Sequence, residues 1–317
     1  MPIGSARIFR FSLYRDRAGS SWFFPAAERY KPRAAVLNVA ITTPSSGRQV
    51  RKACNVRRPL IASLWNWNRK HIFIACFPKS GSTYLSKVLQ ELTGYPGWYA
   101  AEPGEQKEQD LSERRLHRPR RPSIMQQHMR ATQANLELLV WYRMRPIVQT
   151  RNLFDIVASL HDHFEQHGSG LSCGYISQDY LRMAWQERVD YLIHLHLPWY
   201  FNFLLSWRAA ADRLELCHVT YEELFANQAS ELRRIADFYG IRVSNERIVA
   251  AMERAAGRDT RFNVGISGRG AEMLNDDHKH AIYRLAEYCR VELDNSGNVP
   301  CLARRHPVVP DEQVARR

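Results

Sequence analysis

Lysine, serine and threonine side chains surround a single glycine directly after a short apolar run. Residues 72–77 read "IFIACF", and Pro78-Lys79-Ser80-Gly81-Ser82-Thr83 follows at once. Apolar residues then recur from Tyr84 to Leu92 at the spacing of an amphipathic helix. This order predicts a strand, a tight loop and a helix, an arrangement whose backbone N–H groups bind anions. A strand-to-helix turn also favours Pro, Gly and Ser for structural reasons alone, so the loop by itself leaves both interpretations open.

The place of the lysine separates this loop from a Walker A loop, G-x-x-x-x-G-K-[ST], in which the lysine follows the glycine. Lys79 comes before Gly81, and no lysine follows that glycine. We expect the Lys79 ammonium to project from the mouth of the loop, before the helix starts. The amides of Gly81, Ser82, Thr83 and Tyr84 would face an anion, with the two hydroxyls as further donors.

A second group of polar residues follows a later apolar run. In "IVQTRNLFDIVAS", Arg151 comes at the end of an expected strand, and Ser159 lies eight positions on, within an expected helix. Asn152 is suited to cap that helix. An Arg fork and a hydroxyl beside a strand end form a second phosphate site. An ion pair between Arg151 and Asp155 is the structural alternative.

The two motifs together resemble the sulfotransferase family, whose donor is 3′-phosphoadenosine 5′-phosphosulfate (PAPS). The resemblance extends from about residue 71 to 290 and includes the passage "VTYEEL". It implies that the loop holds the 5′-phosphosulfate and that Arg151 and Ser159 hold the 3′-phosphate. It implies no metal, and no cluster of metal ligands is evident in the sequence. The residues that match the donor-binding motifs are Lys79, Ser80, Gly81, Ser82, Thr83, Arg151 and Ser159.

The resemblance also implies a base that removes the acceptor's proton, often a histidine on a strand between the two motifs. His128, in "IMQQHMR", occupies that interval. We predict that His128 is the base and that Lys79 is the second catalytic residue. His196, in "HLP", comes after Arg151 and so stands in the wrong order. The reserves are His194, His196, Glu102 and Glu105. We interpret His161 and His163 as solvated.

A late loop usually closes over the donor in the family, with the pattern R-K-G-x-x-G-x-W. Here "RFNVGISGRG" keeps Gly265 and Gly268 but lacks the Arg-Lys pair and the Trp, where Gly270 stands. We expect Gly265 to contribute to donor binding from this loop, with the charge supplied from a shifted position by Arg269 or, alternatively, by Arg261.

Short apolar runs alternate with helical patterns from residue 70 to 300, which predicts a three-layer α/β/α fold with a mostly parallel sheet. The resemblance makes this the P-loop-NTPase-like sulfotransferase fold. Residues 1–69 contain thirteen Lys or Arg against Asp16 and Glu28, so most of the net charge of +13 lies in this segment. We interpret it as a basic extension, disordered or targeting, and 301–317 as a C-terminal tail.

No apolar run is long enough to span a membrane, and no secretory signal is evident. The cysteines are not spaced for metal binding, and Cys76 and Cys217 lie in apolar runs, which indicates buried thiols in a reducing compartment. We therefore predict a cytoplasmic protein, with organelle targeting by the basic segment as an alternative. A role in specific nucleic-acid binding is not indicated, because the charge is confined to one segment.

The sequence predicts a sulfotransferase that acts on a hydroxyl or amine acceptor. We favour a carbohydrate or a lipid-linked sugar, while phenols, peptides and lipid headgroups also fit. A P-loop kinase or other NTPase is the alternative enzyme, and a tail-driven binder of polyanions on an inactive fold is the alternative without catalysis.

Overall fold

The structure is a computed structural model that describes residues 12–15, 21–24, 71–104, 107–119, 121–167, 174, 176–177, 179–256 and 267–302. Most of the predicted extension (1–69) and tail (301–317) lies outside these ranges. The chain divides into two units, Met1–Arg57 and Arg58–Arg317. In the first unit, β1 (Ser12–Arg15) and β2 (Ser21–Phe24) pair as antiparallel strands.

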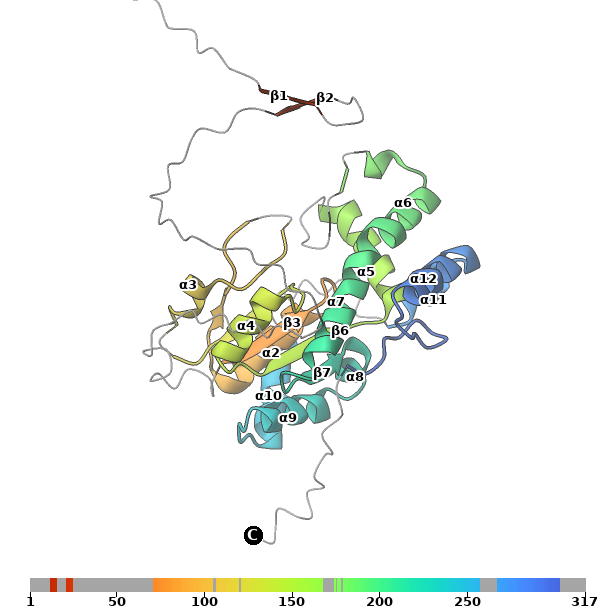
Figure 1. Cartoon of the computed structure of the whole chain (residues 1–317). Coiled ribbons are helices and arrows are strands. Elements are labelled where there is room, and N and C mark those ends of the chain that lie inside the picture. The colour runs from red at the N-terminus through yellow and green to blue at the C-terminus, as the bar shows by residue number, and fades with distance from the viewer. Residues whose placement is uncertain are drawn as a thin grey trace, which may run out of the picture. The chain divides into compact units, whose positions relative to one another are not determined.

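A five-stranded sheet forms the centre of the second unit, in the order β4-β5-β3-β6-β7 (Figure 1). Every neighbouring pair is parallel. The strands are β3 (Ile72–Cys76), β4 (Gly97–Trp98), β5 (Ile124–Gln127), β6 (Pro146–Thr150) and β7 (Cys217–Thr220). All five residues of β3 are buried, as expected for a central strand covered on both faces.

Helices cover each face of this sheet, so the three-layer prediction is confirmed. One apolar core joins Ile72 and Ile74 to Leu85, Leu232 and Ile248. The helices that supply this core are α2 (Ser82–Thr93), α8 (Tyr221–Ala226), α9 (Gln228–Phe238) and α10 (Asn245–Ala256).

The second core lies on the opposite face and joins Phe73, Ala75 and Phe77 to aromatic residues of α7, among them Tyr200 and Phe203. The helices on this side are α4 (Gln133–Trp141), α5 (Leu153–His167), α7 (Leu197–Ala210) and α12 (Asp276–Tyr288). Cys76 and Cys217 are free, buried thiols, as predicted.

Shorter elements complete the described fold. They are α3 (Glu113–Leu116), the 3₁₀ helix η2 (Tyr180–Arg182), α6 (Trp185–Tyr191), the π-helical turn η3 (Leu192–His196) and α11 (Arg269–Met273). Pro198 lies in the first turn of α7, where proline is tolerated, and the π-helical turn precedes it. Figure 1 shows α11 and α12 at one side of the domain, near α5.

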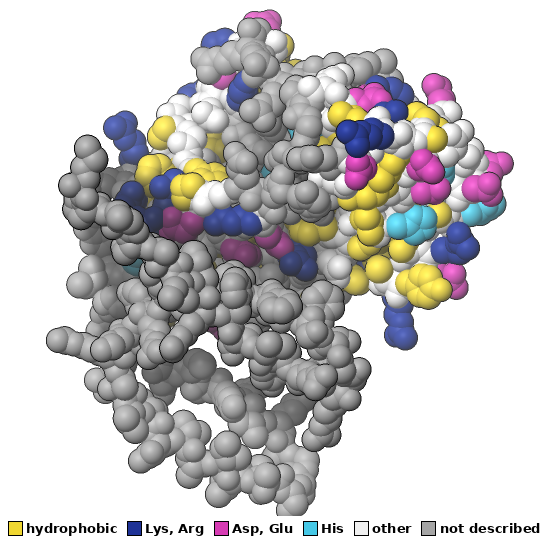
Figure 2. All heavy atoms as spheres, turned by 90° about the horizontal axis from the view of Figure 1, so that it is seen from above, with side chains coloured by type: hydrophobic (Ala, Val, Ile, Leu, Met, Phe, Trp, Pro, Cys, Tyr) yellow, Lys and Arg dark blue, Asp and Glu magenta, His cyan; other side chains and the backbone are white. Residues whose placement is uncertain are grey.

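Positive and negative side chains are interspersed on the part of the second unit's surface that Figure 2 shows in colour. On the face drawn in Figure 2, the coloured Lys and Arg side chains lie among Asp and Glu side chains, with no large region of one sign. Two ion pairs of this kind join Arg114 to Glu102 and Arg130 to Glu108. Within the described residues, no helix has the length and apolar character needed to cross a bilayer.

Candidate donor and transfer site

The loop after β3 has the backbone of an anion-binding nest. Lys79 and Gly81 both have left-handed backbone conformations, with φ of 67° and 75°, and α2 begins one residue later. A left-handed residue beside a right-handed one brings successive N–H groups to the same side of the chain, where they form a concave anion site. A left-handed lysine is unfavourable by itself, so the surrounding contacts must hold it.

Side chains from β6, from the residue directly after β6 and from α7 bind the carbonyl groups of this loop. The hydrogen bonds are Tyr200 Oη to Pro78 O at 3.3 Å, Arg151 Nη1 to Lys79 O at 3.1 Å and Gln149 Nε2 to Ser80 O at 2.8 Å. In a trans peptide the N–H group points away from the carbonyl of the same plane. Fixing these carbonyls therefore fixes the direction of the N–H groups that follow them.

Gly81 is required by space as well as by conformation. A Cβ atom at this position would lie 2.9 Å from Cδ2 of Tyr221 and 3.3 Å from Cε2 of Phe225. The ring of Tyr221 has the Arg151 guanidinium on it, with Cζ 4.1 Å from the ring centroid. Glycine thus allows the loop to approach the ring that also supports Arg151.

The structure brings the two phosphate motifs together. The strands that precede them are neighbours, with Cys76 opposite Gln149, so Arg151 follows β6 at the level of the lysine loop. Arg151 is buried and contacts the Lys79 carbonyl as described. Its Nη2 also lies 3.5 Å from Oδ2 of Asp155, so the alternative ion pair is present in addition.

Ser159 lies buried on α5, the helix that follows Arg151. The start of α5 is capped as predicted, because Asn152 Oδ1 accepts hydrogen bonds from the amides of Phe154 at 2.9 Å and Asp155 at 3.1 Å. The cap fixes where the helix begins, and so fixes the position of Ser159 relative to Arg151.

Two loop residues differ from their predicted roles. The Tyr84 amide donates to the Gly81 carbonyl at 3.0 Å, so it is engaged within the first turn of α2. Ser80 is fully buried, and its hydroxyl donates to Phe77 O at 2.8 Å. Both groups therefore shape the loop, whereas the first amides of a helix, here those of Ser82 and Thr83, have no intrahelical acceptor.

His128 lies at the end of β5 with its ring orientation fixed. Its Nδ1 lies 3.1 Å from the Cys76 carbonyl and 3.3 Å from Cys76 Sγ. A carbonyl only accepts and a thiol sulfur can accept, so a hydrogen on Nδ1 satisfies both contacts and leaves the lone pair on Nε2. Burial lowers the pKa of His128, and the nearby charge of Lys79 lowers it further, while the bond to Cys76 raises it. A neutral imidazole with a free Nε2 is the form that a general base requires.

The other histidines lie in different surroundings. His196 is fully buried in the π-helical turn and packs against the rings of Phe164 and Tyr191 at 5.4 and 6.0 Å. His194 is exposed. The prediction that His161 is solvated is wrong, because this residue is buried near Trp185.

Of the two reserve carboxylates, the structure describes Glu102. Glu102 is held by Arg114 and Ser112, whose hydrogen bonds lower its pKa to about 2. Such a group is a weak proton acceptor at neutral pH. Glu105 lies outside the described residues.

The late loop is represented by α11. Asp155 Oδ2 accepts from the Gly268 amide at 2.9 Å, and Asp155 Oδ1 accepts from the Gly270 amide at 2.7 Å. A Cβ at Gly270 would lie 2.2 Å from the carbonyl carbon of Phe154, so only glycine fits where the family pattern has Trp. Arg269 Nη2 lies 2.5 Å from Asp162, which holds its guanidinium on α5. Gly265 lies outside the described residues.

The sequence did not single out Gln149, Tyr200 or Tyr221, although all three support the loop. "Y-E-E-L" was a signal for Tyr221, but Gln149 reads as an ordinary strand residue and Tyr200 as a core aromatic. Their contacts depend on the packing of strands and helices that are distant in sequence.

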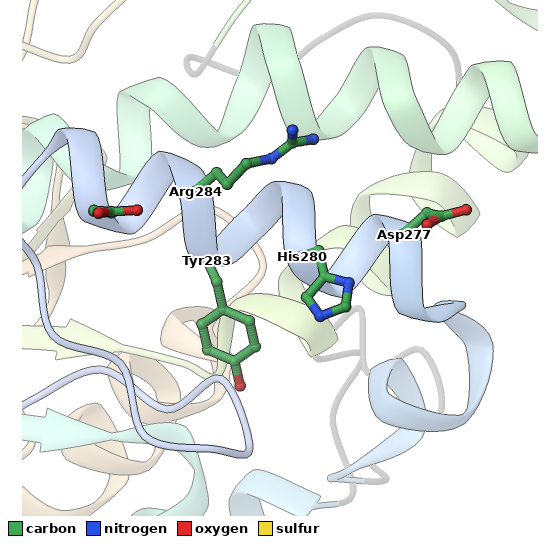
Figure 3. Close-up of a pocket in the computed structure, with 5 residues that line it drawn as sticks. Asp277, His280, Tyr283 and Arg284 are labelled. Atoms are coloured by element: carbon green, nitrogen blue, oxygen red, sulfur yellow. The ribbon is translucent and has the colours of Figure 1, made fainter.

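A separate hollow of about 540 Å³ lies along α12 and is lined by residues of that helix alone (Figure 3). It contains none of the loop residues. The described residues include no group of three or more His, Cys, Asp or Glu side chains arranged to hold a metal ion.

A sulfotransferase domain model matches residues 69–264, and the chain belongs to this family. The predicted family and the predicted enzyme class, a PAPS-dependent sulfotransferase, are thereby confirmed. No curated protein sequence matches the chain.

Solved structures share the fold. A mouse sulfotransferase, SULT7A1, complexed with PAP superposes with a TM-score of 0.54 at 15% identity, over 70% of this chain and 84% of that one. A retinol dehydratase in complex with androsterone and inactive cofactor PAP gives 0.52 at 14% identity, over 70% and 81%. The predicted sulfotransferase fold is therefore confirmed.

Proposed function

We propose that the chain transfers a sulfuryl group from PAPS to a hydroxyl or amine acceptor at the site formed by the lysine loop, Arg151 and His128. The observation that carries the proposal is the 3.1 Å hydrogen bond from Arg151 to the Lys79 carbonyl. It joins the two motifs that would bind opposite ends of a doubly phosphorylated adenosine. PAP, the nucleotide left when PAPS loses its sulfuryl group, is bound in the two structures of similar fold.

The loop provides the 5′ end of the proposed donor site. The amides of Gly81, Ser82 and Thr83 and the Thr83 hydroxyl would hold the 5′-phosphate, supported by the N-terminus of α2. Arg151 and Ser159 would hold the 3′-phosphate. Arg151 carries a planar fork of five N–H donors, which suits a phosphate, and its bond to Lys79 O places that fork beside the loop.

Transfer requires a base for the acceptor and a cation for the leaving oxygen. His128 Nε2 would take the proton while the acceptor oxygen forms its bond to sulfur and the bond from sulfur to the bridging phosphate oxygen breaks. Lys79 would stabilise the negative charge on that bridging oxygen. The influence of Lys79 on the pKa of His128 supports a common location for the two groups.

Androsterone in the retinol dehydratase complex is a small molecule bound by that protein. For this chain, a carbohydrate or lipid-linked sugar stays a prediction, as does a cytoplasmic location.

Calorimetric titration with nucleotides tests the donor assignment. We expect PAP to bind without magnesium and at least about tenfold more tightly than AMP, because a charge-assisted contact to the extra phosphate contributes about 1.5–3 kcal/mol. Binding of ATP with magnesium in preference to PAP would support the kinase or NTPase alternative instead. Transfer of sulfur-35 from labelled PAPS to a panel of sugars, phenols and amines then identifies the acceptor class.

A further inference from the structure

Gln149 is a buried polar residue beneath the lysine loop that no step of the proposed reaction uses. It is the fourth residue of β6 and is fully buried. Its Nε2 donates to the Ser80 carbonyl at 2.8 Å. Because a carbonyl can only accept, this contact fixes which end of the amide faces the loop.

The contact with Ser80 determines the direction of the neighbouring amide. The Ser80 carbonyl and the Gly81 N–H belong to one planar trans peptide and point in opposite directions. With the carbonyl held toward β6, the Gly81 N–H points away from β6, out of the loop. The Gly81 carbonyl accepts from the Tyr84 and Leu85 amides at 3.0 and 3.2 Å, which orients the next peptide in the same way.

This peptide needs an external restraint. Glycine is permissive at φ, so the Ser80–Gly81 peptide can rotate at the Gly81 side at low cost. After such a rotation the carbonyl would face the anion and repel it. The left-handed Lys79 adds strain on the other side of Ser80.

We propose that Gln149 is a positioning residue for the sulfuryl donor, which keeps the Ser80–Gly81 peptide turned so that its N–H group, and not its carbonyl, faces the 5′-phosphate. The inference rests on the proposed donor site. Gln149 acts only through this peptide and makes no contact of its own with the donor.

The test replaces Gln149 by methionine, which has a similar length and no donor. We expect Gln149→Met to raise the Kd for PAP about five- to tenfold, the factor that one hydrogen bond of ordinary net strength supplies. Adenosine 3′-monophosphate should bind the variant as it binds the wild type, because it lacks the 5′-phosphate that the loop would hold. Both constants are measured by calorimetry, with the fraction folded checked by circular dichroism.

Gln127 supplies a matched control. It is also a fully buried glutamine on a strand next to β3, and its amide has no hydrogen-bond partner in the described part of the chain. Gln127→Met should leave the Kd for PAP within about twofold of the wild type. Equal weakening in both variants, or an unchanged Kd in Gln149→Met, would overturn the inference. Failure of the wild type to bind PAP would instead overturn the donor site itself.

Gln149→Glu gives a second measurement that does not depend on the methionine variant. A protonated carboxyl can donate to the Ser80 carbonyl, whereas a carboxylate cannot. We therefore expect the ratio of the variant's Kd for PAP to the wild-type Kd at the same pH to approach unity as the pH is lowered from 8 to 6. A ratio at pH 6 as large as that of Gln149→Met would count against the proposal.

Discussion

Replacement of Gly81 by alanine tests whether the loop depends on close approach to Tyr221. Gly81 has φ of 75°, and an added Cβ would lie 2.9 and 3.0 Å from two carbons of the Tyr221 ring. The ring cannot move freely, because it packs against Phe225 with centroids 4.3 Å apart and against the Arg151 guanidinium.

The cost of the substitution has two parts. A left-handed backbone costs a residue other than glycine about 1–2 kcal/mol. Displacing a packed ring adds about 1–3 kcal/mol. We therefore expect Gly81→Ala to lower the free energy of unfolding by about 2–5 kcal/mol. The affinity for PAP should fall as well, because Tyr221 supports Arg151.

A matched substitution at Gly94 separates the conformational cost from the steric cost. Gly94 caps the end of α2 with φ of 74°, and nothing lies within 4 Å of the Cβ it lacks. Gly94→Ala should cost only the conformational term, about 1–2 kcal/mol, and leave PAP binding unchanged. Urea unfolding and calorimetric titration measure both quantities. Equal losses of stability in the two variants, with PAP binding unaffected in both, would refute the steric argument.

Three further predictions concern charge and protonation. Lys79→Met should lower kcat about 10²- to 10³-fold. It should also move the acid limb of the pH–rate profile to higher pH, because the Lys79 charge lowers the pKa of His128. An unmoved acid limb would show that Lys79 does not act on His128. His128→Ala should lower kcat about 10²- to 10⁴-fold, whereas His194→Ala, at an exposed site, should leave kcat unchanged. The wild-type enzyme should lose activity as the pH falls through the pKa of His128, which lies below 6.5. Burial lowers the pKa of His71 to about 4, so the unfolded chain binds more protons than the folded chain between pH 6.5 and 4. The free energy of unfolding should therefore fall by about 3 kcal/mol as the pH is lowered over that range. Urea unfolding at several pH values should show a weaker pH dependence for His71→Gln.

The parts of the site that the sequence predicted are those encoded locally. The lysine loop was placed between β3 and α2 from three local patterns. These were the apolar run, the glycine-containing loop and the helical spacing of the apolar residues that follow. The pairing of Arg151 with the loop follows from parallel strands, whose carboxyl ends meet at one edge of the sheet. Asn152 was identified as a cap because that role depends only on the next few residues.

The remaining features depend on tertiary packing. Gln149 supports the loop because β6 happens to be the neighbour of β3, and no local pattern marks that contact. His161 has a polar neighbourhood in sequence but is buried beside Trp185, since α6 packs over α5. The contact of Arg269 with Asp162 joins residues more than a hundred positions apart and likewise depends on packing, while a role of Arg269 in donor binding stays a prediction.

Arg151 is immobilised before any nucleotide arrives. A carbonyl, a carboxylate and an aromatic ring each constrain its guanidinium. Ordering a free, long side chain during association costs about 0.5–1.5 kcal/mol of conformational entropy. In this protein the Arg151 side chain is already ordered in the folded state. A contact of Arg151 with a phosphate would therefore lose little conformational entropy on binding.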